Sequence, residues 1–583
     1  MLRYGIILEI TANADMITRL LTLRPIIRKL ADETLVFADW DGFSEAALPG
    51  DAPAGFLRWV SRIVMEAGLV DWLWLVPFAI LAAALSLTAV CFVPKRWRKW
   101  PAFFAAGVVS VLFLFLPVMG VGAGVWLVGE PSYPIMNPLG IIVAAWIFLA
   151  LARLPAARKP LFFAALSVPV AALVVPFGAY PLAALAAAAV FHAVKGGGSP
   201  RRRIASSVFA VALAASAIPL AARFVYDDYS VKLAFDKSHA FFMPWNGVVD
   251  ISVQLEQEAA IKEGDFAKVL AMADRQFASA RTPLRMSVAY RILAQYRLGR
   301  LPDELFKYPM PTSHIDTDAE ELMMDGYVLL FNYGLVMPAR REIYEIASVR
   351  GSQPCHFRIL GDIAAICGEL QLALRYYREL ARCPFRGEFA RRRIKAVEES
   401  DGSAFADIAD IADMHNTWKE FYKTQPNVYF NTDQNVEKFV YTHFRALKSA
   451  PEAMVRMYVA TTLLECDIKS LLDNQGLLDK IAATFAAMKG LPATDGGPWP
   501  DPVQEAVLMF INDIPDVAKK QAAAQSIRQN AISAETVARF NAFMSTPQTA
   551  SLSNPFATTY LFYRAFLFPA GGEPDAKKGE EAK

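Results

Sequence analysis

Residues 160–194 read PLFFAALSVPVAALVVPFGAYPLAALAAAAVFHAV, which is 35 consecutive residues without a charged side chain. A helix needs only about 20 apolar residues to cross a bilayer, so this stretch is too long for one ordinary span. The proline and glycine residues of PFGAYP, at positions 176–181, predict a turn in its middle. We therefore expect the stretch to cross a membrane twice or to form a re-entrant hairpin, because each arm is short for a full span.

Four further stretches lack charged residues and are long enough to cross a membrane: residues 72–93, 101–128, 134–152 and 204–222. Over the whole chain 55% of the residues are hydrophobic and 20% are charged, with a mean hydropathy of +0.28. Soluble proteins contain roughly 45–50% apolar and about 25% charged residues. This composition excludes a purely soluble enzyme and a wholly disordered chain. It predicts an all-α protein with a polytopic transmembrane domain of about six helices over residues 72–225.

The distribution of lysine and arginine sets the expected orientation. Basic residues follow three of the apolar stretches, in the segments 95–99, 153–159 and 195–203, whereas the loop around Glu130 contains none. Cytoplasmic loops carry the excess of lysine and arginine, so these three loops are expected inside and the Glu130 loop outside. The last helix then leaves the cytoplasm near Phe224. The sequence thus predicts a multi-pass membrane protein whose C-terminal domain lies outside the cytoplasm.

The N-terminal residues 1–71 are harder to place. The same rule puts them outside, although Arg19, Arg24, Arg28 and Lys29 lie among them. Two explanations stay open. Either residues 16–30 form a basic amphipathic helix that lies on the membrane surface, or an upstream membrane helix is missing from this chain. Membrane lipid is a predicted partner in both cases.

Four glycines after residue 225 follow one another at intervals of 35, 35 and 34 residues: Gly264, Gly299, Gly334 and Gly368. The residues two and nine positions after each glycine are apolar, and a small residue, Ala373, is expected where the last two helices touch. A period of 34 residues with a glycine between two helical patterns is typical of the tetratricopeptide helix-turn-helix. The spacing predicts a water-soluble α-helical repeat domain over residues 226–400, in which stacked hairpins share their apolar faces.

The rest of the chain shows no further repeat. Residues 401–570 keep a helical pattern and form a predicted second helical region, whereas residues 571–583 lack an apolar run and are expected to be disordered. Residues 1–225 contain 19 basic and 11 acidic residues, and the remainder contains 40 basic and 46 acidic residues. The net charge of the second part is therefore negative, so we expect no nucleic-acid partner.

Six features occur along the chain in a fixed order: Leu48–Gly50 followed by Gly55–Trp59, Trp245, Tyr333–Arg340, Leu360–Leu380, Pro502–Val507, and Pro555–Tyr560 followed by Phe562 and Tyr563. In this order they resemble a family of uncharacterised multi-pass bacterial membrane proteins, catalogued as a domain of unknown function. The resemblance covers residues 32–570 and implies a membrane-embedded N-terminal half and a helical, tetratricopeptide-like repeat domain. It also implies that the membrane is the bacterial inner membrane and that the C-terminal domain is periplasmic. Members of that family tend to begin with an extra membrane helix, and residues 1–31 depart from this pattern. The family carries no catalytic residues that could be transferred.

Motifs for a phosphate-binding loop, a serine nucleophile or a zinc site do not occur in the sequence, so neither a cofactor nor a metal is expected. Cys355, Cys367 and Cys383 lack the tight spacing of structural zinc ligands and are interpreted as free thiols, with a disulfide as the alternative. Asp39 and Asp41 flank Trp40 and are weak catalytic candidates, because two carboxylates can hold a divalent cation or act as a base. The alternative is a solvated turn.

Two functions follow from these observations. The first is a membrane-anchored helical-repeat protein, more plausibly not an enzyme, whose repeats present a surface for a protein or peptide outside the cytoplasm. The second is a polytopic, lipid-sugar-dependent glycosyltransferase-like enzyme of the cell envelope, with Asp39 and Asp41 at its centre. If an upstream helix is missing, this carboxylate pair lies in the first loop outside the cytoplasm. That position resembles the acidic motif of such enzymes, some of which also carry tetratricopeptide domains.

Overall fold

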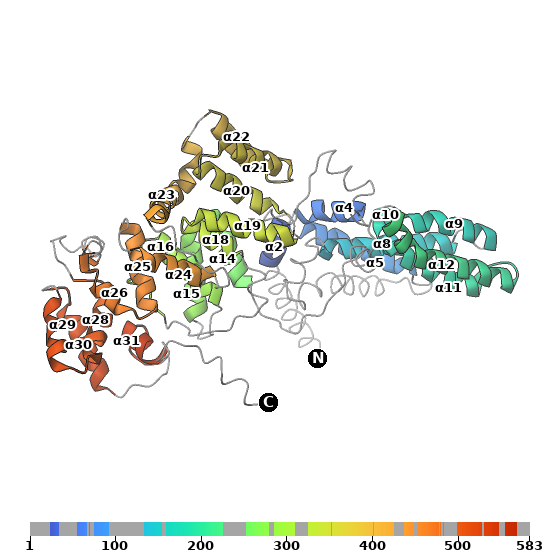
Figure 1. Ribbon diagram of the computed structural model, residues 1–583. Helices are drawn as coiled ribbons and strands as arrows, with labels where there is room; N and C mark the ends of the chain where they lie inside the picture. The colour runs from blue at the N-terminus through green and yellow to red at the C-terminus, as the bar shows by residue number, and fades with distance from the viewer. Residues whose placement is uncertain are drawn as a thin grey trace, which may run out of the picture. The chain divides into compact units, whose positions relative to one another are not determined.

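A computed structural model describes residues 24–33, 55–66, 69, 75–92, 133–153, 159–224, 252–278, 285–308, 325–350, 352–399, 402–424, 436–447, 452–476, 478–479, 482, 498–527, 530–546 and 554–567. The regular elements among these residues are all helices, and no strand occurs among them (Figure 1). The all-α fold class is therefore confirmed for the described part of the chain.

The chain divides into two compact units, which are described separately. The first unit comprises residues 1–255 and 343–406, and the second comprises residues 256–342 and 407–583. This division cuts the predicted repeat region between residues 342 and 343. The domain boundaries expected from the sequence therefore stay predictions.

Six apolar helices form one part of the first unit (Figure 1): α5 (Val76–Phe92), α8 (Tyr133–Arg153), α9 (Pro160–Ala172), α10 (Val174–Phe177), α11 (Tyr180–Lys195) and α12 (Pro200–Phe224). Helix α11 packs against α8, α9 and α12, and α12 also packs against α9. Their shared core contains Phe163 and Leu185 together with the small residues Ala188, Ala189 and Ala210. Small side chains allow the helix backbones to approach closely.

The stretch 160–194 folds into helices that are joined inside the predicted turn. Helix α10 ends at Phe177, and Gly178 follows with a φ of 64°, a left-handed conformation that favours glycine. Among the described residues one helix, Ile135–Arg153, is both long and apolar enough to cross a membrane. The apolar helices on either side of the turn are shorter than that, and residues 101–128 lie outside the described residues. The six-helix membrane domain stays a prediction.

These apolar helices are hydrophobic on the outside as well as in the core. Leu161 is 81% exposed, Val194 is 69% exposed and Val208 is 61% exposed. Further large hydrophobic residues with exposed side chains on the same helices are Ile80, Leu87, Trp146, Phe162, Val168, Val190, Ile204 and Phe209. Exposed apolar area of this extent is unusual for a protein surface in water.

The first unit also contains two short amphipathic helices, α2 (Arg24–Glu33) and α4 (Gly55–Glu66), and a helical hairpin near its end in the sequence. Arg386 lies between them: its Nη1 is 2.9 Å from the Asp32 carboxylate of α2, and its Nε is 3.7 Å from the Glu66 carboxylate of α4. Glu66 is fully buried and its carboxylate has no hydrogen-bond partner among the described residues. Burial raises the pKa of Glu66 to about 8.

The four periodic glycines share one backbone conformation. Their φ angles are 78°, 67°, 73° and 77° for Gly264, Gly299, Gly334 and Gly368. Each glycine N–H donates to the carbonyl three residues earlier, and the next N–H donates to the carbonyl five residues before it, as from Glu369 to Ala364 at 2.8 Å. These paired bonds are those of a Schellman motif, which ends a helix at a left-handed glycine. The sequence period therefore marks four equivalent helix ends.

Three of the four glycines precede a second helix, as predicted, giving α14 (Ser252–Glu263) with α15 (Phe266–Ala278), α18 (Gly326–Asn332) with α19 (Val336–Arg350), and α20 (Pro354–Ile366) with α21 (Leu370–Arg382). In the last pair Gly361 lets the Tyr377 ring approach, since a Cβ at residue 361 would lie 2.4 Å from that ring. The predicted contact residue Ala373 is fully buried there, and the Tyr377 hydroxyl donates to Asp362 at 2.6 Å.

The expectation of a second helix after Gly299 is wrong. Residues 301–308 form a series of turns instead. Pro302 and Pro309 bracket a stretch that is too short for a stable helix, and each proline lacks the backbone N–H that would extend a helical hydrogen-bond pattern. Arg291 holds this segment, because its Nη2 donates to the carbonyl of residue 304 at 3.2 Å and its guanidinium lies 5.1 Å from the Tyr308 ring.

The second unit also contains α16 (Arg285–Arg297), the helix that ends at Gly299. It continues with helices that have no counterpart in the glycine period: α23 (Ala409–Thr424), α24 (Val436–Ala446), α25 (Glu452–Leu464), α26 (Ile468–Leu472), α28 (Asp501–Asp513), α29 (Val517–Ser526), α30 (Ala534–Ser545) and α31 (Tyr560–Phe562). Helix α25 packs against α16, α24, α26 and α28. It is thus a central element of this unit.

Candidate functional site

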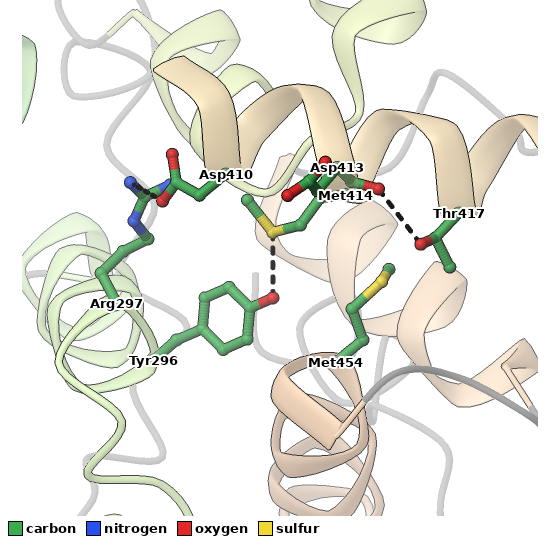
Figure 2. Close-up of a pocket in the computed structure, with 7 residues that line it drawn as sticks. All are labelled: Tyr296, Arg297, Asp410, Asp413, Met414, Thr417 and Met454. Carbon is green, nitrogen blue, oxygen red and sulfur yellow. Dashed lines mark hydrogen bonds and ion pairs between the residues drawn. The ribbon is translucent and has the colours of Figure 1, made fainter. Parts of the chain in front are cut away.

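A cavity of about 280 Å³ lies in the second unit, between helices α16, α23 and α25 (Figure 2). It is lined by Tyr296, Arg297, Asp410, Asp413, Met414, Thr417 and Met454. Helix α23 contributes four of these residues, at positions 410, 413, 414 and 417. Residues three and four apart lie on one face of a helix, so this face of α23 forms one wall.

The floor of the cavity is apolar. Tyr296, Met414 and Met454 are 7%, 9% and 1% exposed, respectively. The Tyr296 hydroxyl donates to the Met414 sulfur at 3.0 Å (Figure 2), and burial raises the pKa of Tyr296, which keeps the hydroxyl protonated. Methionine side chains are flexible and polarizable, so they adapt to apolar groups of different shapes.

The rim of the cavity is charged. Arg297 forms an ion pair of 2.5 Å with Asp410. Arg297 is also held from two other sides, because its Nη1 donates to the Asn332 carbonyl at 3.2 Å and its guanidinium lies 4.8 Å from the Phe266 ring. The neighbouring Asp413 carboxylate is exposed and has no partner among the described residues. The rim therefore carries one unpaired negative charge.

The walls of the cavity are fixed by contacts outside it. Trp418 of α23 is buried, donates from its indole nitrogen to the Tyr333 carbonyl at 2.9 Å and packs edge-to-face against Phe444 of α24 at 5.1 Å. Arg456 of α25 donates to the carbonyl of Gly299, at the Schellman turn that ends α16. These contacts, together with the ion pair between Arg297 of α16 and Asp410 of α23, hold the three helices in place around the cavity. The cavity is therefore a preformed site.

No metal site is found in or around the cavity among the described residues. Groups of three or more histidine, cysteine or acidic residues that could hold a metal ion do not occur among the described residues. Pockets for drug-sized ligands and cofactors enclose about 300–1,000 Å³. At about 280 Å³ this cavity lies near the lower end of that range, and it is large enough for one or two side chains of a partner.

The catalytic candidates Asp39 and Asp41 lie outside the described residues, so their surroundings stay untested. The five cysteines of the chain are free thiols. Cys355 and Cys383 are buried, and burial raises the pKa of the Cys383 thiol to about 12, so this thiol is unreactive at neutral pH.

Comparison with known proteins identifies the family. Residues 51–567 match the model of the Family of unknown function (DUF6057). The chain belongs to the DUF6057 family. No curated protein and no solved structure matches the chain. The predicted resemblance to a family of unknown function is thereby confirmed for most of the chain, whereas the membrane and tetratricopeptide-like characters of this DUF6057 protein stay proposals.

Two of the features behind that resemblance meet in the structure of this DUF6057 protein. Glu505, in the feature at 502–507, is 2% exposed and accepts a hydrogen bond of 2.9 Å from the backbone N–H of Tyr560, in the feature at 555–560. Arg539 donates to the other Glu505 oxygen at 2.9 Å. A buried carboxylate that is fully paired in this way joins distant segments of the second unit, so we interpret these features as structural.

The sequence reasoning missed the cavity residues, although two signals pointed to them. Asp410, Asp413, Met414 and Thr417 occur at the spacing of one helix face within a predicted helical region. Arg297 lies two residues before the periodic Gly299, where a helix end was already predicted. The partner helix α25 could not have been paired with them from periodicity alone, because it follows in the chain after a long interval.

Proposed function

We propose that this DUF6057 protein is a membrane-anchored helical-repeat protein that presents a binding surface for a protein or peptide outside the cytoplasm. The observation that carries this proposal is the preformed cavity of the second unit, with its apolar floor and charged rim. Protein-binding sites commonly have this form: a buried apolar centre that takes an anchoring side chain, surrounded by a polar rim. The cavity is large enough for one or two side chains of a partner.

The outward-facing hydrophobic residues of α5, α8, α9, α11 and α12 support the membrane anchor. A bundle in water would bury Leu161, Val194 and Val208, whereas lipid leaves them in a favourable environment. The basic segments at 95–99, 153–159 and 195–203 then assign the cytoplasmic side by the excess of lysine and arginine. The protein belongs, in this proposal, to the bacterial inner membrane.

The contacts of helix α4 support a location outside the cytoplasm for the hairpin α20–α21 of the first unit. The Phe56 ring of α4 packs edge-to-face on Phe177 at 5.8 Å, beside the turn that is expected outside. At the other end of α4, Glu66 contacts Arg386, which follows the hairpin. The helix therefore spans from the outer turn of the apolar bundle to the end of the repeat region.

The four Schellman glycines support the repeat character. Three of them are followed by a second helix, and the phased positions Val269, Ala339 and Ala373 are all fully buried. A tetratricopeptide-like repeat uses such small or apolar residues where its two helices touch. The break at residues 301–308 interrupts the series, so the proposed repeats are irregular.

Photo-crosslinking in living cells tests the proposed binding surface. A photoreactive amino acid replaces Thr417 at the cavity rim, and in a matched control it replaces the exposed Lys519 of α29. We expect an ultraviolet-dependent adduct with a protein from position 417 and none from position 519. Equal labelling at both positions, or no adduct at 417, would contradict the proposal. Loss of function in a double Asp39→Asn, Asp41→Asn variant at normal protein level would favour the glycosyltransferase-like enzyme instead.

A further inference from the structure

We infer that the cavity binds a peptide segment in which an aliphatic side chain lies beside a lysine or arginine. The aliphatic side chain occupies the methionine floor, and the basic side chain pairs with the Asp413 carboxylate at the rim. This inference rests on the proposed function and names the class of partner.

The charge of the rim selects the basic residue. Arg297 is already paired with Asp410 and is also held by Asn332 and Phe266, so it is not available for an acidic ligand. Asp413 is exposed and unpaired among the described residues, on the same helix face as Asp410. An incoming cation therefore finds one free carboxylate, whereas an incoming carboxylate meets two negative charges beside a single committed arginine.

The floor selects the aliphatic residue. Met414 and Met454 line the cavity from two different helices, α23 and α25 (Figure 2). The Tyr296 hydroxyl already donates to the Met414 sulfur, so the floor offers no free strong donor to a polar group. A polar side chain buried here would lose its hydrogen bonds to water, while an unbranched or branched aliphatic chain would gain contacts.

The size of the cavity agrees with this occupant. A volume of about 280 Å³ admits one large aliphatic side chain together with the stem of a neighbouring basic residue. Lysine and arginine bury their methylene stems on apolar surface and leave the charged head at the rim. Both parts of the ligand thus fit a single site with an apolar interior and an acidic edge.

Methyl NMR on the full chain in detergent micelles tests the inference. Methionine is labelled with ¹³C at its methyl group, and the resonances of Met414 and Met454 are assigned by single substitution to isoleucine. Two probes are compared: acetyl-Ala-Leu-Lys-Leu-Ala-amide and the same peptide with glutamate in place of lysine. We expect the lysine peptide to shift both resonances with saturation and the glutamate peptide to bind at least tenfold more weakly.

A pair of variants then tests whether binding depends on the carboxylate at the cavity rim or on any carboxylate of the protein surface. Asp413→Asn should weaken binding of the lysine peptide about tenfold, the effect of losing one favourable charge pair worth roughly 1.4 kcal/mol. Asp513→Asn removes an exposed carboxylate at the end of α28, outside the cavity, and should leave the affinity unchanged. Equal losses in both variants would overturn the role of Asp413.

The outcomes distinguish this inference from the proposed function. If both peptides shift Met414 and Met454 with equal affinity, the cavity binds peptides but the selection for a basic residue is wrong. If neither peptide shifts these two resonances while the photo-crosslink at position 417 forms, a partner is bound but not through this class of segment. If neither peptide nor crosslink is observed, the proposed function fails as well.

Discussion

The hairpins α11–α12 and α20–α21 have similar interiors and opposite surfaces. Both pack small residues in the contact between their helices, fully buried Ala189 in the first and fully buried Ala373 in the second. On the outside, α11 and α12 expose valines such as Val190 and Val208, whereas α21 exposes Arg378 and other polar residues. The comparison shows that the packing between the two helices of a hairpin does not distinguish a hairpin in lipid from one in water. The side chains on the outer face of the hairpin carry that information.

The largest expected effect concerns Glu66, the buried acidic residue that contacts Arg386 beside the hairpin α20–α21. The described residues of the hairpin α11–α12 include no acidic residue. The pKa of Glu66 is raised from 4.5 to about 8 in the folded chain by burial. As the pH rises from about 4.5 to 8, the unfolded chain loses this proton first, so stability decreases by about 1.4 kcal/mol for each pH unit. Thermal unfolding in detergent between pH 5 and 8 measures this decrease.

Glu66→Gln is the matched control for that prediction. Glutamine has no charge to bury, so its unfolding midpoint should depend less on pH than that of the unmodified chain, and the two should converge toward pH 5. Parallel pH profiles for the two proteins would mean that Glu66 ionises normally and is not the buried acid described here.

The next largest effect on stability is expected from a charged residue introduced on the outer face of α12. Val208→Asp places a carboxylate on the exposed face of α12. At the centre of a membrane helix such a change costs about 2.5–3.5 kcal/mol, so at Val208, nearer the start of α12, we expect a cost of up to that size. Leu370→Asp makes the same kind of change on α21, at a residue that is 47% exposed, and should stay within about 0.5 kcal/mol. The yield and thermal stability of the two purified variants can be compared directly. Equal tolerance of both changes would argue against lipid around α12.

Overpacking of the second hairpin should have a smaller effect. Ala373 is fully buried between α20 and α21, so Ala373→Leu should cost about 1–3 kcal/mol. Gln371→Leu adds a side chain of the same size at an exposed position of the same helix and serves as control. If chemical unfolding does not distinguish the two variants, the helix contact is not where the structure places it.

The smallest expected effect tests the Schellman turn alone. Gly368 has a φ of 77°, and a Cβ added there would meet no atom within 4 Å. Gly368→Ala should therefore cost about 1–2 kcal/mol through backbone strain without a clash. Gly476 also has space for a Cβ but no left-handed φ, so Gly476→Ala should be neutral or stabilising. Equal stability of the two variants would contradict the left-handed turn.

Much of the fold was readable from the sequence, because it depends on local signals. The glycine period marked four helix ends, and the PFGAYP segment marked the break in the long apolar stretch. The turns at 301–308 were not predicted, since the glycine period alone implies a second helix after Gly299. The cavity was not predicted because it depends on contacts between α16, α23 and α25, which lie more than 100 residues apart along the chain at their extremes.

Cysteine accessibility tests the central claim most directly, namely a membrane anchor with the second unit outside. In a chain without its five native cysteines, single cysteines replace Gly197, in the loop between α11 and α12, and Lys519, on the surface of α29. A membrane-impermeant maleimide should label position 519 in intact spheroplasts, whereas position 197 should be labelled only after permeabilisation. Labelling of position 197 but not 519 in intact spheroplasts would reverse the orientation, and equal labelling of both would contradict the account.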